Sequence, residues 1–130
     1  MKVDLPAATH IDGNSFQNCL NLTNMNLPAA IHIDDYAFNS TGTGSLTITF
    51  GVAVPSYLGQ ELFVGVSSAK TLIIRVPNVA AWNSIVAGSP YTGTDTTQNW
   101  GNGFRGMGWN GSSTTGGPVN NNITLLVQYY

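Results

Sequence analysis

The chain has 130 residues, 42% of them hydrophobic and only 8% charged, with a formal net charge of −2 at pH 7. This hydrophobic content suffices for a packed core, whereas charged residues usually make up about 25% of a globular protein, so we expect Asn, Thr, Ser and Gly to cover most of the surface. The scattered Lys and Arg residues argue against nucleic-acid binding and against attraction to an anionic membrane. No apolar run reaches the roughly 20 residues of a membrane span, and the single cysteine, Cys19, excludes an intrachain disulfide.

The first forty residues contain an internal repeat. Residues 5–16 return at 27–38, with eight of the twelve positions identical. A period of this size is typical of stacked repeat proteins, in which no single unit buries its own apolar face. No signal peptide is visible and the sequence starts inside the pattern, so we expect a C-terminal piece of a longer protein.

Each copy of the repeat is expected to contain a strand followed by turns. Residues 22–27 alternate apolar side chains with asparagines, as a half-buried strand does, and Pro28 ends this strand because it has no N–H to donate. In the segment 31–34 we expect the isoleucines to point inward and the His and Asp side chains outward. The Ala-Phe pair at 37–38 would then supply a large apolar plug on the far side.

Two further strands are expected at 46–50 and 71–76. In the first of these, Ile48 and Phe50 are the counterparts of Met25 and Leu27, and the added length of this copy falls in the turn-rich segment 40–45. Between these strands, residues 58–63 are expected to take the Ala-Phe role, with Phe63 as the plug.

After Pro77 the pattern changes. Asn78 is expected to cap a short helix over 79–86 that ends at Gly88, with a buried face of Trp82, Ile85 and Val86. Residues 91–122 are rich in Gly, Thr, Asn and Ser, and residues 122–130 are strongly β-prone. The pattern therefore divides the chain into a repeat region at 1–78 and a flank at 79–130, with a helix, a Gly/Asn/Thr-rich loop and a final strand, that covers the end of the array.

These residues resemble a known family. The motif Leu22-x-x-Met25-x-Leu27-Pro28, followed by Ile33 and Ala37-Phe38, resembles the BspA-type leucine-rich repeat, and residues 16–22 match its F-x-x-C-x-x-L part. The resemblance covers about residues 3–78 as four repeats, of which the last two are degenerate. It departs from the family where Gly51 and Pro55 interrupt a turn that the family keeps short, and the segment 99–109 is similar to tails that follow such repeats in bacterial proteins.

The resemblance implies a leucine-rich-repeat solenoid, mainly β with short helical and turn segments. Such a fold has a parallel sheet with one strand per repeat, here with a C-terminal capping flank. The family further implies a bacterial cell-surface or secreted protein associated with adhesion and with binding to host-matrix proteins or other surface proteins.

Three functions follow as hypotheses. The first is a non-enzymatic scaffold that binds a protein through its strand face, where the exposed residues are expected to be Thr23, Asn24, Asn26, Thr47, Thr49, Ile73 and Arg75. The second is a carbohydrate-binding flank that uses Trp100, Phe104 and Trp109, although aromatic packing of the cap is the favoured interpretation of these residues. The third is a purely structural array cap, whose open N-terminal edge near residues 3–5 pairs with another chain or is poorly ordered. No acid–base pair, nucleophile constellation or cofactor fingerprint stands out, so we expect neither an enzyme nor a cofactor.

His10 and His32 occupy equivalent positions in the repeat, as do Asp12 and Asp34. Equivalent positions on neighbouring turns of a stack lie about 5 Å apart, so these side chains are expected to meet on one strip. A divalent metal site or a pH-sensitive patch is one interpretation. Surface residues copied along with the repeat are the favoured one.

Two smaller features favour structural interpretations. Asp34 and Asp35 beside Asn39 lack the spaced carboxylates of a calcium-binding motif, which favours a solvated turn. Cys19 has no identifiable partner histidine, and the repeat places it inward as a small core residue.

Overall fold

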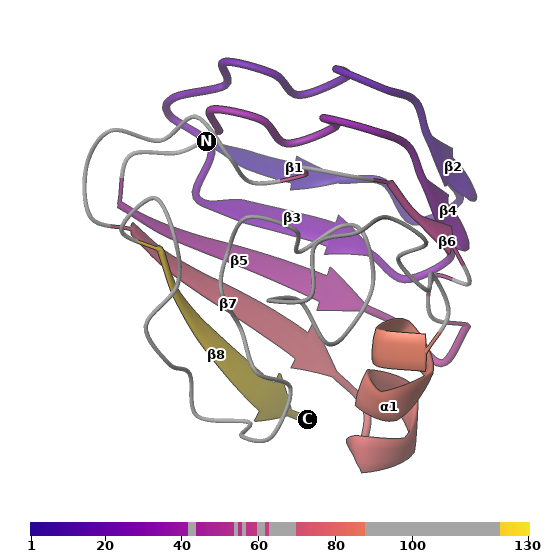
Figure 1. Cartoon of the computed structure of the whole chain (residues 1–130). Coiled ribbons are helices and arrows are strands. Elements are labelled where there is room, and N and C mark those ends of the chain that lie inside the picture. The colour runs from indigo at the N-terminus through magenta and orange to yellow at the C-terminus, as the bar shows by residue number, and fades with distance from the viewer. Residues whose placement is uncertain (42–43, 54, 56, 60–61, 63–69, 88–122) are drawn as a thin grey trace, which may run out of the picture.

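The computed structural model describes residues 1–41, 44–53, 55, 57–59, 62, 70–87 and 123–130. In this part of the chain, two parallel β-sheets lie at an angle to each other and a helix follows the fourth strand of the larger one (Figure 1). The five-stranded large sheet has the order β1 (Lys2–Asp4), β3 (Asn24–Leu27), β5 (Ser45–Phe50), β7 (Lys70–Val76) and β8 (Ile123–Tyr129). The three-stranded small sheet has the order β2 (His10–Ile11), β4 (His32–Ile33) and β6 (Tyr57–Leu58), and the helix is α1 (Val79–Ala87).

From β1 to β7 the chain alternates between the two sheets, with odd-numbered strands in the large sheet and even-numbered strands in the small one. The register follows the spacing of the repeat. Met25 is paired with Ile48 and Leu27 with Phe50, which confirms the expected correspondence between β3 and β5. One copy earlier, Val3 is paired with Met25, so equivalent positions of the repeat lie side by side across the sheet.

A third set of contacts joins the turn segments 12–20 and 34–41. The N–H groups of Asn14, Phe16 and Asn18 donate to the carbonyls of Asp35, Ala37 and Asn39, over 3.3, 2.9 and 3.0 Å. Backbone φ angles are positive at Asn14 and Asn18, and again at the equivalent positions of the next copy, Tyr36 and Ser40. The second segment therefore repeats the backbone path of the first, even where the side chains differ.

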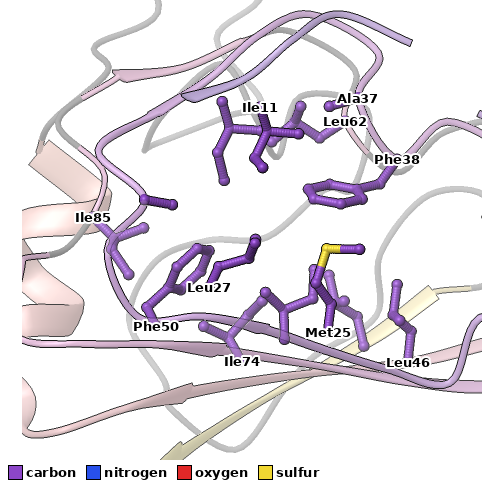
Figure 2. Packing of buried hydrophobic residues seen from close by; sticks show 14 of the residues in the cluster. Ile11, Met25, Leu27, Ala37, Phe38, Leu46, Phe50, Leu62, Ile74 and Ile85 are labelled. Atoms are coloured by element: carbon purple, nitrogen blue, oxygen red, sulfur yellow. The ribbon is translucent and has the colours of Figure 1, made fainter. Parts of the chain in front are cut away.

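One hydrophobic cluster fills the space between the sheets and reaches the helix (Figure 2). Phe38 is fully buried in it and stacks on Phe16, with ring centroids 5.8 Å apart, so the expected plug is confirmed. Ile11 and Ile33 are buried, also as expected.

One inward placement expected from the repeat is wrong. Ile31 is 39% exposed, because the Ala30 N–H bonds back to the Leu27 carbonyl and the turn formed there breaks the strand alternation before β4 begins. Cys19 packs against the core, as expected, but is only half-buried.

Asn78 caps the N-terminus of α1, as expected. The Asn78 side chain accepts a hydrogen bond from the Ala81 N–H over 2.9 Å, which is the capping geometry that satisfies a free donor of the first turn. Trp82 and Ile85 are buried, as expected. The helix ends at Ala87, and Gly88 lies outside the described residues. The expected C-terminal strand is confirmed as β8, which pairs in parallel with β7 and so extends the large sheet.

The strand β6 was not expected, because residues 58–63 were assigned to the Ala-Phe role. In the structure Leu58 is paired with Ile33 and so occupies the position of the repeat isoleucine. Leu62 is buried, while Phe63 lies outside the described residues. No helix in the described part of the chain is long and apolar enough to cross a membrane.

Glycines occur where backbones come very close. A Cβ atom on Gly51 would overlap the carbonyl group of Pro28, and one on Gly59 would overlap the backbone at Asp34 and Asp35. The chain leaving β5 therefore passes directly over the turn that follows β3, and Gly51 lies where a side chain would overlap this turn.

Candidate binding surface

The large sheet presents one polar face to solvent. Met25, Ile48 and Ile74 point into the core, because successive side chains of a strand alternate between the two faces of the sheet. Their neighbours along each strand form two rows on the opposite face, which we call the strand face. The first row is Lys2, Asn24, Thr47, Ile73 and Leu126, and the second row is Asp4, Asn26, Thr49, Arg75 and Gln128.

The structure thus brings all five predicted protein-binding residues together on adjacent strands. Asn24, Asn26, Thr47, Thr49 and Arg75 are half-buried, so their side chains are held in place but remain accessible. Ile73 lies among them, as expected, whereas Thr23 precedes β3 and donates its hydroxyl to the Met1 carbonyl over 3.1 Å.

Side-chain contacts hold two parts of the second row. The Asn26 side chain donates to Asp4 Oδ1 over 2.9 Å. On β7, the Arg75 guanidinium lies over the Tyr130 ring, 5.2 Å from its centroid. The Tyr130 hydroxyl in turn donates to the Phe50 carbonyl over 2.5 Å, which ties the residue after β8 to the end of β5.

The chemistry of the strand face is that of neutral amides and hydroxyls. Its centre, at Asn24, Asn26, Thr47 and Thr49, offers hydrogen-bond donors and acceptors without charge, repeated at the spacing of neighbouring strands, about 4.8 Å. Charges occur on Lys2 and Asp4 of the edge strand β1 and on Arg75 of β7. Such a face can bind a partner by many weak hydrogen bonds.

A second cluster lies on the small sheet. His10 stacks on His32 with centroids 5.2 Å apart, and His32 stacks on Tyr57 with centroids 4.4 Å apart. The three rings come from paired positions of β2, β4 and β6 and form one aromatic ladder. Sequence reasoning found the two histidines but missed Tyr57, because extra residues before β6 shift it out of the spacing that relates His10 to His32.

The rings of the ladder lie face to face. Stacked imidazoles turn their faces toward each other, whereas the nitrogen lone pairs that bind a metal lie in the ring planes. In addition, His10 Nδ1 lies 3.1 Å from Thr9 Oγ1, and Asp34 Oδ1 accepts a hydrogen bond from the Asp35 N–H. No group of three or more His, Cys, Asp or Glu residues that could hold a metal ion occurs in the described ranges.

Among the described residues, Tyr57 is a titratable group whose environment clearly alters its pKa. Partial burial raises the pKa of its hydroxyl above the usual value of 10.0, and the carboxylates of Asp35 and Asp34 raise it further, because each of these effects disfavours the phenolate. The neutral hydroxyl is therefore favoured beside these two aspartates.

Two further candidates, the aspartate turn and Cys19, make local contacts. Asp34 and Asn39 have local partners, since the Asp34 carboxylate accepts from the backbone and the Asn39 side chain accepts from Ser40 Oγ over 3.0 Å. The Cys19 thiol lies 4.0 Å from the Gln17 carbonyl. Trp100, Phe104 and Trp109, the carbohydrate candidates, lie outside the described residues.

Comparisons with known proteins found no matching family model, no matching curated protein and no matching solved structure.

Proposed function

We propose that this chain is part of a non-enzymatic binding scaffold, a leucine-rich-repeat solenoid of the BspA type from a bacterial surface or secreted protein. Its ligand would be a protein that contacts the strand face. The observation that carries the proposal is the pair of rows across five parallel strands, because this face is broad and regular and its centre, at Asn24, Asn26, Thr47 and Thr49, is polar and uncharged.

The solenoid assignment is supported by the way each copy of the repeat pairs with the next. Strands of the large sheet, strands of the small sheet and turn segments all pair with their counterparts about one repeat later. Each copy shares the core of its neighbours, which is the arrangement of repeat proteins that present extended binding faces.

A protein ligand is favoured by the composition of the face. Rows of amides and hydroxyls beside the apolar Ile73 and Leu126 can form hydrogen bonds around a dry patch, as protein interfaces do. Each contact is weak, so affinity would depend on several of them forming together, and several copies of the face would add avidity.

The test is a plate-binding assay of the purified chain on a panel of extracellular-matrix proteins. An Asn24→Ala, Thr47→Ala double variant should lower the affinity for the bound member about tenfold or more, because both residues lie in the centre of the face. Gln17→Ala is the matched control, since Gln17 is exposed on a turn segment away from this sheet. Absence of binding to the whole panel, or equal binding by the double variant and the control, would refute the proposal.

A further inference from the structure

The strand face differs in chemistry from one side to the other, because two apolar side chains and a positive charge lie together on β7 and β8. Ile73 and Leu126 are paired positions of these two strands, which lie side by side in the large sheet (Figure 1). Both are half-buried, and so is Arg75, which follows Ile73 by two residues and therefore projects from the same face. We call Ile73, Leu126 and Arg75 the anchor patch.

The Arg75 guanidinium is held in place by a ring contact. It lies over the Tyr130 ring, and the Tyr130 hydroxyl is bound in turn to the Phe50 carbonyl. Stacking on a ring orients the planar guanidinium and leaves its N–H donors available in the ring plane. No hydrogen bond or ion pair of this guanidinium occurs among the residues that the structure describes.

The acidic residue of the two rows, Asp4, does little to neutralise Arg75. Asp4 lies on β1, three strands away from β7. At about 4.8 Å per strand this separation is about 14 Å, which exceeds the Debye length of about 8 Å at physiological ionic strength. The Asp4 carboxylate also accepts a hydrogen bond from the Asn26 side chain. The charge of Arg75 is therefore available to an incoming anionic group.

We propose that the anchor patch selects an acidic segment of a partner protein, in which a carboxylate binds Arg75 and an aliphatic side chain two residues away covers Ile73 and Leu126. The inference rests on the proposed protein-binding function and names the chemistry of the partner. Side chains two residues apart in an extended segment are about 6.7 Å apart, the same spacing that strand geometry gives to Ile73 and Arg75. A carboxylate can accept two N–H groups of one guanidinium, which makes the contact selective.

The apolar pair favours a protein segment over an anionic polysaccharide. A polyuronate such as alginate offers carboxylates at regular intervals, but it has no aliphatic side chain to cover Ile73 and Leu126. Burial of this pair by the partner adds a contribution that a polyuronate cannot supply. Alginate therefore serves as the competing probe in the test.

The proposal is tested by nuclear magnetic resonance titration of the isotope-labelled chain with two synthetic heptapeptides. The first consists of serine and threonine with a leucine at its third and a glutamate at its fifth position, and the second has glutamine in place of the glutamate. We expect the glutamate peptide to shift the Arg75 Nε–H signal and to bind about fivefold more tightly than the glutamine peptide. Arg75→Gln should bind the two peptides equally.

Gln17→Glu is the matched control. It lowers the net charge by one, as Arg75→Gln does, but on an exposed turn segment away from this sheet, so it should keep the preference for the glutamate peptide. Retained binding of the glutamine peptide by Arg75→Gln shows that this variant is folded, and the comparison of the two peptides on the wild type needs no variant at all.

Four results would overturn the proposal. They are absence of binding to both peptides, equal affinity of the wild type for both, a preference that survives in Arg75→Gln, and a shift of the Arg75 signal by alginate at a lower carboxylate concentration than by the glutamate peptide. The plate assay with the Asn24→Ala, Thr47→Ala variant reports separately on the proposed function. If that assay succeeds while the peptides are not distinguished, the strand face binds proteins and only the selectivity of the anchor patch is wrong.

Discussion

At the residue scale, the turn segments 12–20 and 34–41 have the same backbone conformation at equivalent positions even where the residue types differ. Asn14 and Asn18 take positive φ values, as asparagine does more readily than most residues, but their counterparts Tyr36 and Ser40 take them as well. The hydrogen bonds between the turn segments explain this, because a change of backbone path in one segment would break its ladder with the other.

The tightest residue-scale constraint is at Gly51. We expect Gly51→Ala to lower the free energy of unfolding by about 1–3 kcal/mol, because a methyl group there overlaps the Pro28 carbonyl and the backbone must move. Urea unfolding followed by circular dichroism measures the loss.

Gly44→Ala is the matched control. A Cβ atom on Gly44 meets nothing within 4 Å, so this variant should unfold within about 0.5 kcal/mol of the wild type. Equal stability of the two alanine variants would show that the close approach at Gly51 is not a constraint.

At the element scale, the small sheet consists of strands of two residues each, and such short strands gain little from their backbone bonds alone. The aromatic ladder of His10, His32 and Tyr57 adds side-chain contact between the paired positions. Tyr57 also places a hydroxyl beside two aspartates, which makes this element sensitive to alkaline pH.

We expect the chain to lose stability as the pH rises through and above 10. The pKa of Tyr57 is raised in the folded state, so folding favours the protonated hydroxyl; this contribution is complete below pH 10.0 and is lost as the pH rises through the folded-state pKa. Tyr57→Phe should flatten the fall in unfolding free energy between pH 9 and 11, while Tyr129→Phe should keep the wild-type slope. The prediction fails if the two variants show the same slope.

The elements also show how far the sequence predicts the fold. The register of β3 with β5, the start of α1 at Asn78 and the strand β8 are recoverable from spacing, capping and β-propensity, because each depends on local pattern. The strand β6 could not be predicted from the sequence, because residues inserted before it change its spacing from the earlier repeats. Its pairing with β4 identifies it in the structure.

The candidate sites divide in the same way. The strand face could be predicted, because alternation along each strand and the spacing of the repeat together place its residues on one side of the sheet. The contact of Arg75 with Tyr130 could not, because it depends on the parallel pairing of β8 with β7, which joins segments far apart in the sequence.

At the scale of the whole molecule, the chain is held together by apolar packing and hydrogen bonds. It carries four basic and six acidic residues in 130, and one apolar cluster links both sheets and the helix. Salt, which screens charges, should therefore have little effect on the stability of the folded chain.

We expect the thermal midpoint of the monomer, measured at low micromolar concentration, to change by no more than about 2 °C between 20 and 300 mM NaCl, because exposed charge pairs contribute little and are few. Differential scanning calorimetry measures it. A large shift of the monomer midpoint would show that charge contributes more to the fold than we infer.

The parallel pairing has a consequence for how the chain acquires its fold. Among the described residues, no two strands of the large sheet are joined by a hairpin. Between the partners Lys2 and Asn24 the chain passes through the small sheet, and Lys70 pairs with Ile123, which lies much later in the sequence. Chains whose contacts are this distant in sequence fold slowly, because loop entropy is lost before any ladder bond forms. During synthesis β1 and β3 can associate once both have left the ribosome, whereas β7 keeps an open edge until β8 has been made.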